Sequence, residues 1–376
     1  MNNIYIIAYC FYAFIVYLAG FLLHNLRIKG IRSETVLFFI IIIGALIAAF
    51  RPEKTQDTEM YNLVYEESLK YINGIRINGF SSIFANRSFH DIELFYVMIM
   101  ACFRTLFKSP VVFYFIQGII VNSLMIQGLY LLCEYIFDLD TKYKKRQFLD
   151  GYLFVIYSLY IMFCGLLYMS SAIRDGLSIG LGLYAIGSLL NRKRKIIALA
   201  FMVMSILIHT TSLVLIGIYA LLWLWKSKMQ RLLVYGMCLL IPVLYFARIG
   251  AILVGLFTII VERILETFHI QAFYSYINTL DYQLPMREGY LIVLTCLITA
   301  LFTMITFKSS KYIAVVIFGM LLFTVAYPIP ALARLLYIFI LFLIPTTIQR
   351  NKNWNYFYLA WGLYFVPQYI YVFSYL

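Results

Sequence analysis

Charged residues are scarce in this sequence. Of its 376 residues, 12% are Asp, Glu, Lys or Arg and 64% are hydrophobic, and the mean hydropathy is +0.88. A soluble domain is about one quarter charged and about half apolar, so this composition excludes a water-soluble globule. The apolar runs are continuous rather than alternating, which excludes a transmembrane β-barrel. The sequence therefore predicts an all-α fold, a polytopic bundle of transmembrane helices.

Three other signals are missing. The six cysteines lie within apolar runs, and no two of them form a disulfide or metal-binding motif, so we interpret them as small apolar residues. No internal repeat is visible, so the chain lacks the inverted-repeat pattern of many secondary transporters. The N-terminus has no basic region and no small-residue cleavage site, and we expect the first helix to remain as a span.

Twelve apolar runs are long enough for crossings, given that about 20 helical residues span the ~30 Å hydrocarbon layer. Several are short, and these must extend into flanking polar residues or lie where the layer is thin. The stretch 91–107 is apolar but carries Asp91, Glu93 and Arg104, and each charge costs roughly 2.5–3.5 kcal/mol at the bilayer centre. We interpret 91–107, and similarly 249–261, as short re-entrant or interfacial helices. The twelve predicted spans are 4–23, 35–50, 111–137, 152–169, 172–190, 196–208, 211–225, 232–247, 290–307, 312–327, 335–348 and 354–376.

The net charge of +13 comes from six short basic loops. Such a charge could suit a nucleic-acid partner, but in a membrane chain cytoplasmic loops rich in Lys and Arg are the commoner cause. We therefore predict no nucleic-acid partner. The twelve spans place all six loops on the cytoplasmic side. These loops and their edges hold 18 basic and 5 acidic residues, whereas the outer side holds 12 of each. The basic loops are 27–32, 142–146, 192–195, 226–231, 308–311 and 350–352.

This topology predicts a single integral membrane domain over 1–376 with two large outer segments, 51–91 and 249–289. Within the first, Tyr and Leu residues of 59–72 recur at helical spacing opposite acidic residues, which predicts an amphipathic helix. The second segment is rich in Phe and Tyr, whose rings suit sugar faces or lipid headgroups. Both segments are therefore candidates for substrate contact.

Ionisable residues at the outer membrane edge are the candidate functional groups, because placing such residues near the bilayer costs free energy and they are usually found there for a functional reason. Each has a simpler explanation: an arginine at a span end can extend to the headgroups, Arg174 can pair with Asp175, and His209 can cap a turn. Together, however, three arginines on one wetted face indicate an anion site, because guanidinium groups bind phosphate through two parallel hydrogen bonds. The outer-face positions are Arg51, Glu93, Arg174, His209 and Arg334.

The same positions carry a resemblance. The segment 51–61 (RPEKTQDTEMY) resembles the Arg-Tyr-x-x-Gly-Thr-Asp-Tyr-x-x-Tyr loop of the EpsG/Wzy-type family of bacterial membrane polysaccharide polymerases. Further matches follow in the family's order over most of the chain. They are Glu93 before an apolar short helix, 171–177 (SAIRDGL), the hairpin tip at His209, and Arg334 to Tyr337. Thr55, Thr58 and Asp175 depart from the family pattern.

The resemblance implies a polymerase for O-antigen, capsule or exopolysaccharide repeat units, and a fold similar to the GT-C-like glycosyltransferases of lipid-linked sugars. The substrates implied are oligosaccharides on undecaprenyl diphosphate, at the outer leaflet of the bacterial inner membrane. Membrane lipids, a chain-length regulator and a flippase of the same pathway are the implied partners. Neither a cofactor nor a metal is implied.

Residue roles follow from the resemblance and from the chemistry of a diphosphate leaving group. Fixed arginines can stabilise its developing charge without a metal, and a base must take the proton of the acceptor hydroxyl. We expect the diphosphate to contact Arg174 and Arg334, assisted by Arg51. His209 is the first choice of base, and Asp57 or Glu93 is the second. Tyr61, Tyr337 and Tyr274 are the candidate sugar-binding residues.

Other functions stay open at this stage. A flippase for the same lipid-linked oligosaccharide is the main alternative, although it needs charge in both halves of the bundle and the ionisable residues here lie on one face. The motif Asp138-Leu-Asp140 could bind a metal and a nucleotide sugar, but its cytoplasmic position beside a basic run indicates a solvated turn. A purely structural role and a membrane acyltransferase with His209 as base are further alternatives.

Overall fold

The computed structural model describes residues 2–26, 33–52, 58–78, 88–89, 92–137, 153–224, 230–249, 311–326 and 335–347, with five further positions between 252 and 263. Three candidate site residues, Asp57, Tyr274 and Arg334, lie outside the described residues, as do the predicted spans 290–307 and 354–376 and most of the segment 249–289. The described part is almost entirely helical, as the sequence predicts.

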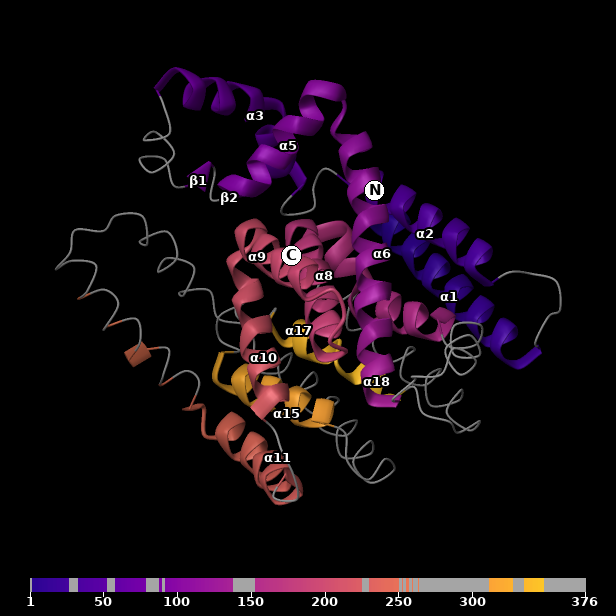
Figure 1. Cartoon of the computed structure of the whole chain (residues 1–376), viewed down its shortest axis with the longest axis vertical. Coiled ribbons are helices and arrows are strands. Elements are labelled where there is room, and N and C mark those ends of the chain that lie inside the picture. The colour runs from indigo at the N-terminus through magenta and orange to yellow at the C-terminus, as the bar shows by residue number, and fades with distance from the viewer. Residues whose placement is uncertain are drawn as a thin grey trace. The chain divides into compact units, whose positions relative to one another are not determined.

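The described residues form two compact units, one ending at Gly217 and the other comprising Ile218–Thr347 (Figure 1). Each unit is described by itself. The first contains α1 (Asn2–Leu26), α2 (Ser33–Ala49), α3 (Thr58–Asn78), β1 (Ser88–Phe89), β2 (Ile92–Glu93), α5 (Leu94–Leu106), α6 (Pro110–Phe137), η1 (Ile161–Gly165), η2 (Leu167–Ser171), α8 (Ile173–Leu190), α9 (Lys195–Ile208), η3 (Thr210–Ser212) and the start of α10 (Leu213–Leu224). The second contains the rest of α10, then α11 (Gln230–Phe246), α15 (Lys311–Ala326), α17 (Leu335–Ile340) and α18 (Leu343–Thr347).

Helix α8 is central in the first unit, where it packs against α6 and α9 (Figure 1). Glycines let α6 and α8 approach closely: a Cβ added at Gly128 of α6 would lie 2.8 Å from the Cβ of Leu183. Between α8 and α9, Ser178 donates to the carbonyl oxygen of Ser205 (2.9 Å), and Ser205 donates back to that of Ser178 (2.6 Å). These contacts hold the N-terminal part of α8 against the C-terminal part of α9.

The turn from α8 to α9 is tied to α6 by an ion pair between a partly exposed lysine and a buried glutamate. The Nζ atom of Lys193 lies 2.6 Å from Oε1 of Glu134, a residue that is 5% exposed. On either side, Arg192 and Arg194 adopt left-handed backbone angles and are exposed. The basic loop therefore turns one cation inward and leaves its neighbours facing outward.

The predicted span 152–169 is not a regular α-helix. Helix Leu153–Gly165 changes to π-helical winding at η1, and η2 continues to the break at Ala172 (φ −87°, ψ 58°). Tyrosines of α1 brace this segment, since Tyr9 donates to the carbonyl oxygen of Ile161 (2.7 Å) and the hydroxyl groups of Tyr12 and Tyr157 are hydrogen-bonded (2.7 Å). Extended π-helical winding is uncommon and occurs frequently at functional sites.

The segment 51–107 contains two helices where the sequence predicts helical structure, and their interfacial or re-entrant placement stays a prediction. Residues 59–72 lie within the helix α3, whose Tyr61 and Tyr65 are buried and whose Glu66 is exposed. The stretch 91–107 contains the short apolar helix α5, preceded by the antiparallel pair β1–β2. The hydroxyl of Tyr65 donates to the carbonyl oxygen of Phe107 (2.8 Å) and fastens α3 to the end of α5.

In the second unit, α15 packs against α11, α17 and α18. A Cβ at Gly319 of α15 would lie 2.3 Å from the Cβ of Phe339, so these helices also touch through a glycine. Tyr337, one of the candidate sugar-binding residues, is half-buried on α17.

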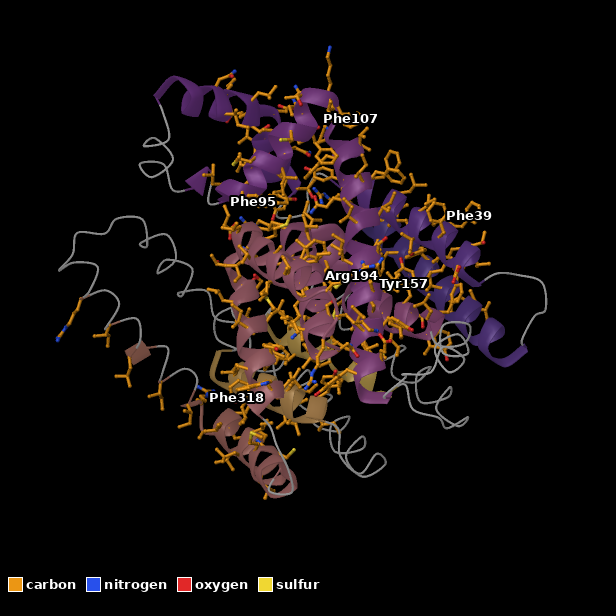
Figure 2. All side chains as sticks on the ribbon, in the orientation of Figure 1. Phe39, Phe95, Phe107, Tyr157, Arg194 and Phe318 are labelled. Carbon is orange, nitrogen blue, oxygen red and sulfur yellow. The ribbon has the colours of Figure 1, made fainter. Side chains whose placement is uncertain are left out.

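Two described helices are long and apolar enough to cross a membrane, Pro110–Tyr135 and Ile173–Leu190, and nine shorter apolar helices accompany them. Large apolar side chains also face outward: Phe39 is 59% exposed, whereas Tyr157 is fully buried in the interior (Figure 2). Such an apolar exterior supports a membrane protein. The count of twelve crossings remains a prediction.

Candidate functional site

The N-terminus of α8 carries two ionised residues that face different partners. Arg174 and Asp175 are adjacent, and neighbouring residues on a helix do not face each other. Accordingly, Nη1 of Arg174 lies 2.5 Å from Oε2 of Glu93, whereas Oδ1 of Asp175 lies 2.6 Å from Nε2 of His209. The interpretation of Arg174 and Asp175 as a self-contained pair is therefore wrong.

His209 bridges two carboxylates. It follows the last residue of α9 in an extended conformation, and its Nδ1 atom lies 2.5 Å from Oε1 of Glu93 while Nε2 contacts Asp175. The backbone N–H of Thr210 also points to Glu93 (3.3 Å), and the hydroxyl of Thr211 donates to Asp175 (3.0 Å). A ring flanked by two carboxylates satisfies both only when both nitrogen atoms carry protons.

The electrostatics of this cluster favour the charged form of each group at its centre. Burial alone would lower the pKa of His209, but the hydrogen bonds to Asp175 and Glu93 outweigh it and raise the pKa to about 9. For Glu93, burial opposes ionisation, yet the hydrogen bond from His209 and the charge of Arg174 lower its pKa below the usual value. At neutral pH the four groups Glu93, Arg174, Asp175 and His209 sum to zero charge.

Arg51 lies in a different environment. It follows α2, is only 6% exposed, and its guanidinium carbon lies 3.7 Å from the ring centre of Tyr114 and 5.9 Å from that of Tyr61. The rings hold the cation by cation–π attraction. None of its three guanidinium nitrogen atoms has a hydrogen-bond partner among the described residues. A buried guanidinium of this kind is a candidate to pair with an anion.

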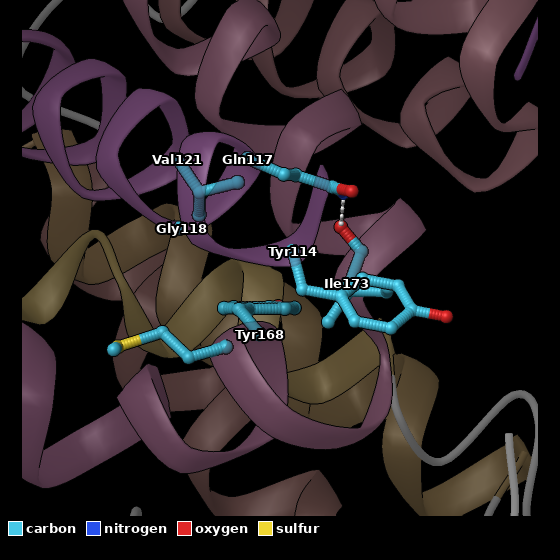
Figure 3. A pocket seen from close by; sticks show the side chains of 7 residues that line it. Tyr114, Gln117, Gly118, Val121, Tyr168 and Ile173 are labelled. Atoms are coloured by element: carbon cyan, nitrogen blue, oxygen red, sulfur yellow. Dashed lines mark hydrogen bonds between the residues drawn. The ribbon is translucent and has the colours of Figure 1, made fainter. Parts of the chain in front are cut away.

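A chain of aromatic and amide contacts joins Arg51 to the start of α8. The ring of Tyr61 lies 6.0 Å from that of Tyr96, whose hydroxyl donates to Oε1 of Gln117 (2.8 Å). In turn, Nε2 of Gln117 donates to the carbonyl oxygen of Ile173 (2.9 Å), the residue before Arg174 (Figure 3). Tyr61 is also close enough to Arg174 to interact with it electrostatically.

A small pocket lies beside this chain of contacts. Tyr114, Gln117 and Ile173 belong to its lining (Figure 3). The aromatic side chains Tyr114 and Tyr168 form much of its wall. The pocket therefore adjoins both the ring that supports Arg51 and the backbone that precedes Arg174.

Of the nine candidate site residues, the structure brings Glu93, Arg174 and His209 into direct contact and places Arg51 against Tyr61. Tyr337 belongs to the second unit. The sequence did not identify the roles of Asp175, Thr211, Tyr114 and Gln117. For Asp175 a signal existed, because a residue next to Arg174 on a helix must face another partner.

No group of three or more His, Cys, Asp or Glu side chains in the described ranges could hold a metal ion. Comparison with known proteins gives one result. The family model described as EpsG family matches residues 34–376, nearly the whole chain, in agreement with the resemblance seen in the sequence. No curated protein and no solved structure matches the chain.

Proposed function

The chain belongs to the EpsG family, and from that premise we propose that it is a polymerase of undecaprenyl-diphosphate-linked oligosaccharide repeat units. The family suggests a role in polysaccharide polymerisation, and the apolar helices support a place in the membrane. Our proposal adds the finer points: a multi-pass protein of the bacterial inner membrane with about twelve crossings, a GT-C-like fold and an active site on the outer face.

One observation carries the proposal. Arg51 and Arg174, far apart in the chain, both lie near Tyr61, and Arg174 belongs to a cluster that also holds two carboxylates and an imidazole. A glycosyl transfer from a lipid diphosphate needs these parts: a cation for the leaving group, a base for the acceptor and an aromatic face for a sugar. Arg334 is proposed as a third cation that contacts the diphosphate.

The reaction follows from these parts. The acceptor hydroxyl oxygen bonds to the anomeric carbon of the donor sugar while the bond from that carbon to the diphosphate oxygen breaks. The electron pair of the broken bond leaves on the lipid diphosphate, which gains one negative charge. Arginine N–H groups stabilise that charge, since charge-assisted hydrogen bonds to phosphate are among the stronger ones in proteins.

Glu93 is our choice for the base that accepts the hydroxyl proton. His209 was the first choice from sequence, but both of its nitrogen atoms face carboxylates and its pKa near 9 keeps it protonated at neutral pH. The carboxylate of Glu93 is 23% exposed, and carboxylates serve as bases in glycosyl chemistry with oxocarbenium-like transition states. Asp57 remains a candidate, and Tyr61, Tyr337 and Tyr274 are proposed to contact sugars.

The test is an in vitro reaction. Purified protein is incubated with lipid-linked repeat units, and the products are resolved on a gel. We expect a ladder of longer glycans with the wild-type protein and none with Arg174→Ala or Glu93→Ala. Arg192→Gln, an exposed arginine of the α8–α9 turn, is the control and keeps the ladder.

A second readout separates polymerase from flippase. The same protein in liposomes is given lipid-linked repeat units in one leaflet, and their appearance in the other leaflet is followed. Transfer across the bilayer without any longer product would overturn the proposal and favour the flippase. A ladder that persists in both Arg174→Ala and Glu93→Ala would overturn the assignment of this cluster as the site.

A further inference from the structure

We propose that Glu93 couples the acceptor proton to the leaving group: the step that protonates Glu93 also gives the site one positive charge, through Arg174, for the departing diphosphate. The inference rests on the proposed function and adds a role for the contact between the two residues. It follows from which atoms of Glu93 face which neighbours.

The two oxygen atoms of Glu93 have different partners. Oε2 faces Nη1 of Arg174 at 2.5 Å, and Oε1 faces Nδ1 of His209 at 2.5 Å. Each carboxylate oxygen has two lone pairs; Oε1 also accepts from the backbone N–H of Thr210 (3.3 Å), whereas Oε2 retains capacity for a further hydrogen bond. Because Glu93 is 23% exposed and Arg174 is 16% exposed, a substrate hydroxyl can approach the carboxylate beside the guanidinium.

Charge conservation gives the coupling. Before the reaction, Arg174 and His209 balance Glu93 and Asp175, so the cluster is neutral as a whole. When Glu93 takes the acceptor proton, the cluster gains one positive charge. In the same step the lipid diphosphate gains one negative charge as its bond to the sugar breaks. The attraction between site and leaving group therefore grows in the transition state, the condition for catalysis rather than tighter substrate binding.

Arg51 and Arg174 then have separate tasks. Arg51, stacked on Tyr114 and without a hydrogen-bond partner among the described residues, offers a constant positive charge to the donor before reaction. Arg174 is balanced by Glu93 at rest, and its charge is exposed to the diphosphate only while Glu93 holds the proton. Because the ion pair and the hydrogen bond from His209 lower the pKa of Glu93, the proton passes to water afterwards and the cluster returns to neutrality.

The structure supplies a matched control in Asp175. This carboxylate contacts His209 and Thr211, whereas Nη1 of Arg174 contacts Glu93. Asp175→Asn also removes one negative charge and one carboxylate contact of His209, as Glu93→Gln does, but it leaves the carboxylate beside Arg174 in place. Glu93→Gln removes the carboxylate that faces the guanidinium itself. The two variants thus separate a specific contact from a general change in charge.

The experiment measures affinity and turnover separately. Undecaprenyl diphosphate, the leaving group, is titrated into the full-length protein in nanodiscs of neutral lipid, and polymerisation is measured with lipid-linked repeat units. We expect Glu93→Gln to bind undecaprenyl diphosphate about tenfold more tightly, the effect of one added charge-assisted contact. We expect its turnover to fall about 10²–10⁴-fold, the contribution typical of a general base.

Three further measurements keep the test decisive. Glu93→Ala removes the same charge but leaves a smaller side chain, and it must also tighten binding of undecaprenyl diphosphate. The inference therefore does not depend on the folding of a single variant. Asp175→Asn must leave the affinity within about threefold of the wild-type value, the scale on which the tightening is judged. The double variant Glu93→Gln with Arg174→Gln must lose the gain in affinity.

Weaker binding in both Glu93 variants would overturn the inference, because it would mean that Glu93 only holds the site together. Equal tightening in Asp175→Asn would overturn it too, since any lost negative charge would then suffice. The proposed function fails separately, if the wild-type protein makes no longer glycan. If the proposed function fails, the affinities of the variants for undecaprenyl diphosphate can still be compared. If the wild-type protein polymerises but the Glu93 variants bind undecaprenyl diphosphate as the wild-type protein does, only the coupling is refuted.

Discussion

The side-chain amide of Gln117, on helix α6, donates to the carbonyl oxygen of Ile173 at 2.9 Å. This hydrogen bond fixes the first residue of α8 against α6. The next residue is Arg174, which contacts Glu93, and Asp175 follows with its contact to His209. A buried amide on one helix therefore helps to position the ionised residues at the start of another helix. Positions of this kind decide whether charged groups meet within hydrogen-bond distance.

Gln117→Leu is expected to destabilise the protein and impair the site. Leucine is similar in size but leaves the hydroxyl of Tyr96 without its buried partner, at a cost of about 1–3 kcal/mol, and removes the hydrogen bond from the amide to the carbonyl oxygen of Ile173. Thermal unfolding in detergent measures the loss, and the polymerisation ladder measures the effect on the site. Ser158→Ala is the control, because the Ser158 hydroxyl donates within its own turn, to the carbonyl oxygen of Val155 (3.0 Å), and to no other group in the part of the chain that the structure describes. Equal melting temperatures for the two variants would contradict the role of Gln117.

Stability should depend on pH through His209. A group whose pKa is higher in the folded state stabilises the fold fully below its unfolded pKa, near 6.5, and this stabilisation is lost as pH rises through the folded value, about 9. The groups that set this shift are Glu93, Asp175 and Arg174. We expect the wild-type protein to lose stability between about pH 6.5 and 9, by on the order of 3 kcal/mol at most.

The measurement is the midpoint of thermal unfolding from pH 6 to 9.5. His209→Gln has no group that titrates in this window and should show a flatter profile than the wild-type protein. A wild-type profile that rises between pH 7 and 9, or parallel profiles for the two proteins, would show that His209 is not held as an imidazolium between the carboxylates.

Sequence reasoning found Glu93, Arg174 and His209 because an ionisable residue in an apolar setting is conspicuous, but it could not find their pairing. Glu93 and Arg174 are 81 positions apart, and Glu93 and His209 are 116 apart, so only the packing of α5, α8 and α9 brings them together. Arg51 was likewise predicted at the site. Its support on the Tyr114 ring depends on how α6 lies against the end of α2, which periodicity does not reveal.

The helices themselves were more predictable than their winding. Continuous apolar runs predict α5, α6, α8 and α9, and the helical spacing of Tyr and Leu predicts α3, because hydrophobic length and period depend on local sequence alone. The π-helical segment from Ile161 to Ser171 was not predicted, since a wider turn is favoured only by its surroundings. The hydroxyl of Tyr9, for example, meets the carbonyl oxygen of Ile161 at the point where the winding changes.

Arg51→Met should separate function from stability. Methionine removes a buried charge that lacks a hydrogen-bond partner among the described residues, and the lost cation–π attraction is worth about 0.5–2 kcal/mol, so we expect stability within about 1 kcal/mol of wild type. Polymer yield should fall at least about tenfold, because a guanidinium contact to phosphate is lost. The ladder and the melting temperature are measured on the same preparation.

Lys193→Met gives the opposite pattern and serves as the comparison. Its ammonium lies 2.6 Å from the buried carboxylate of Glu134, and removing one partner of a buried pair is destabilising, here by about 1–3 kcal/mol because Lys193 is partly exposed. Activity per folded molecule should persist. If Arg51→Met were as destabilising as Lys193→Met and as active, then Arg51 would be a structural cation and not part of an anion site.

Gly176→Ala tests whether the close contact between η2 and α8 is needed. A Cβ at this position would lie 2.5 Å from the carbonyl oxygen of Tyr168, a backbone atom that cannot move without displacing η2. Arg174 and Asp175 are the two residues before it, so the displacement should reach both. We expect a loss of stability of about 1–3 kcal/mol, the usual cost of overpacking, with a loss of the ladder.

Gly217→Ala is the matched control, since no heavy atom lies within 4 Å of a Cβ there and alanine favours a helix by about 0.5–1 kcal/mol. If both alanine variants were equally stable and active, the tight approach of η2 would not be what fixes the N-terminus of α8, and Gln117 would have to hold it alone.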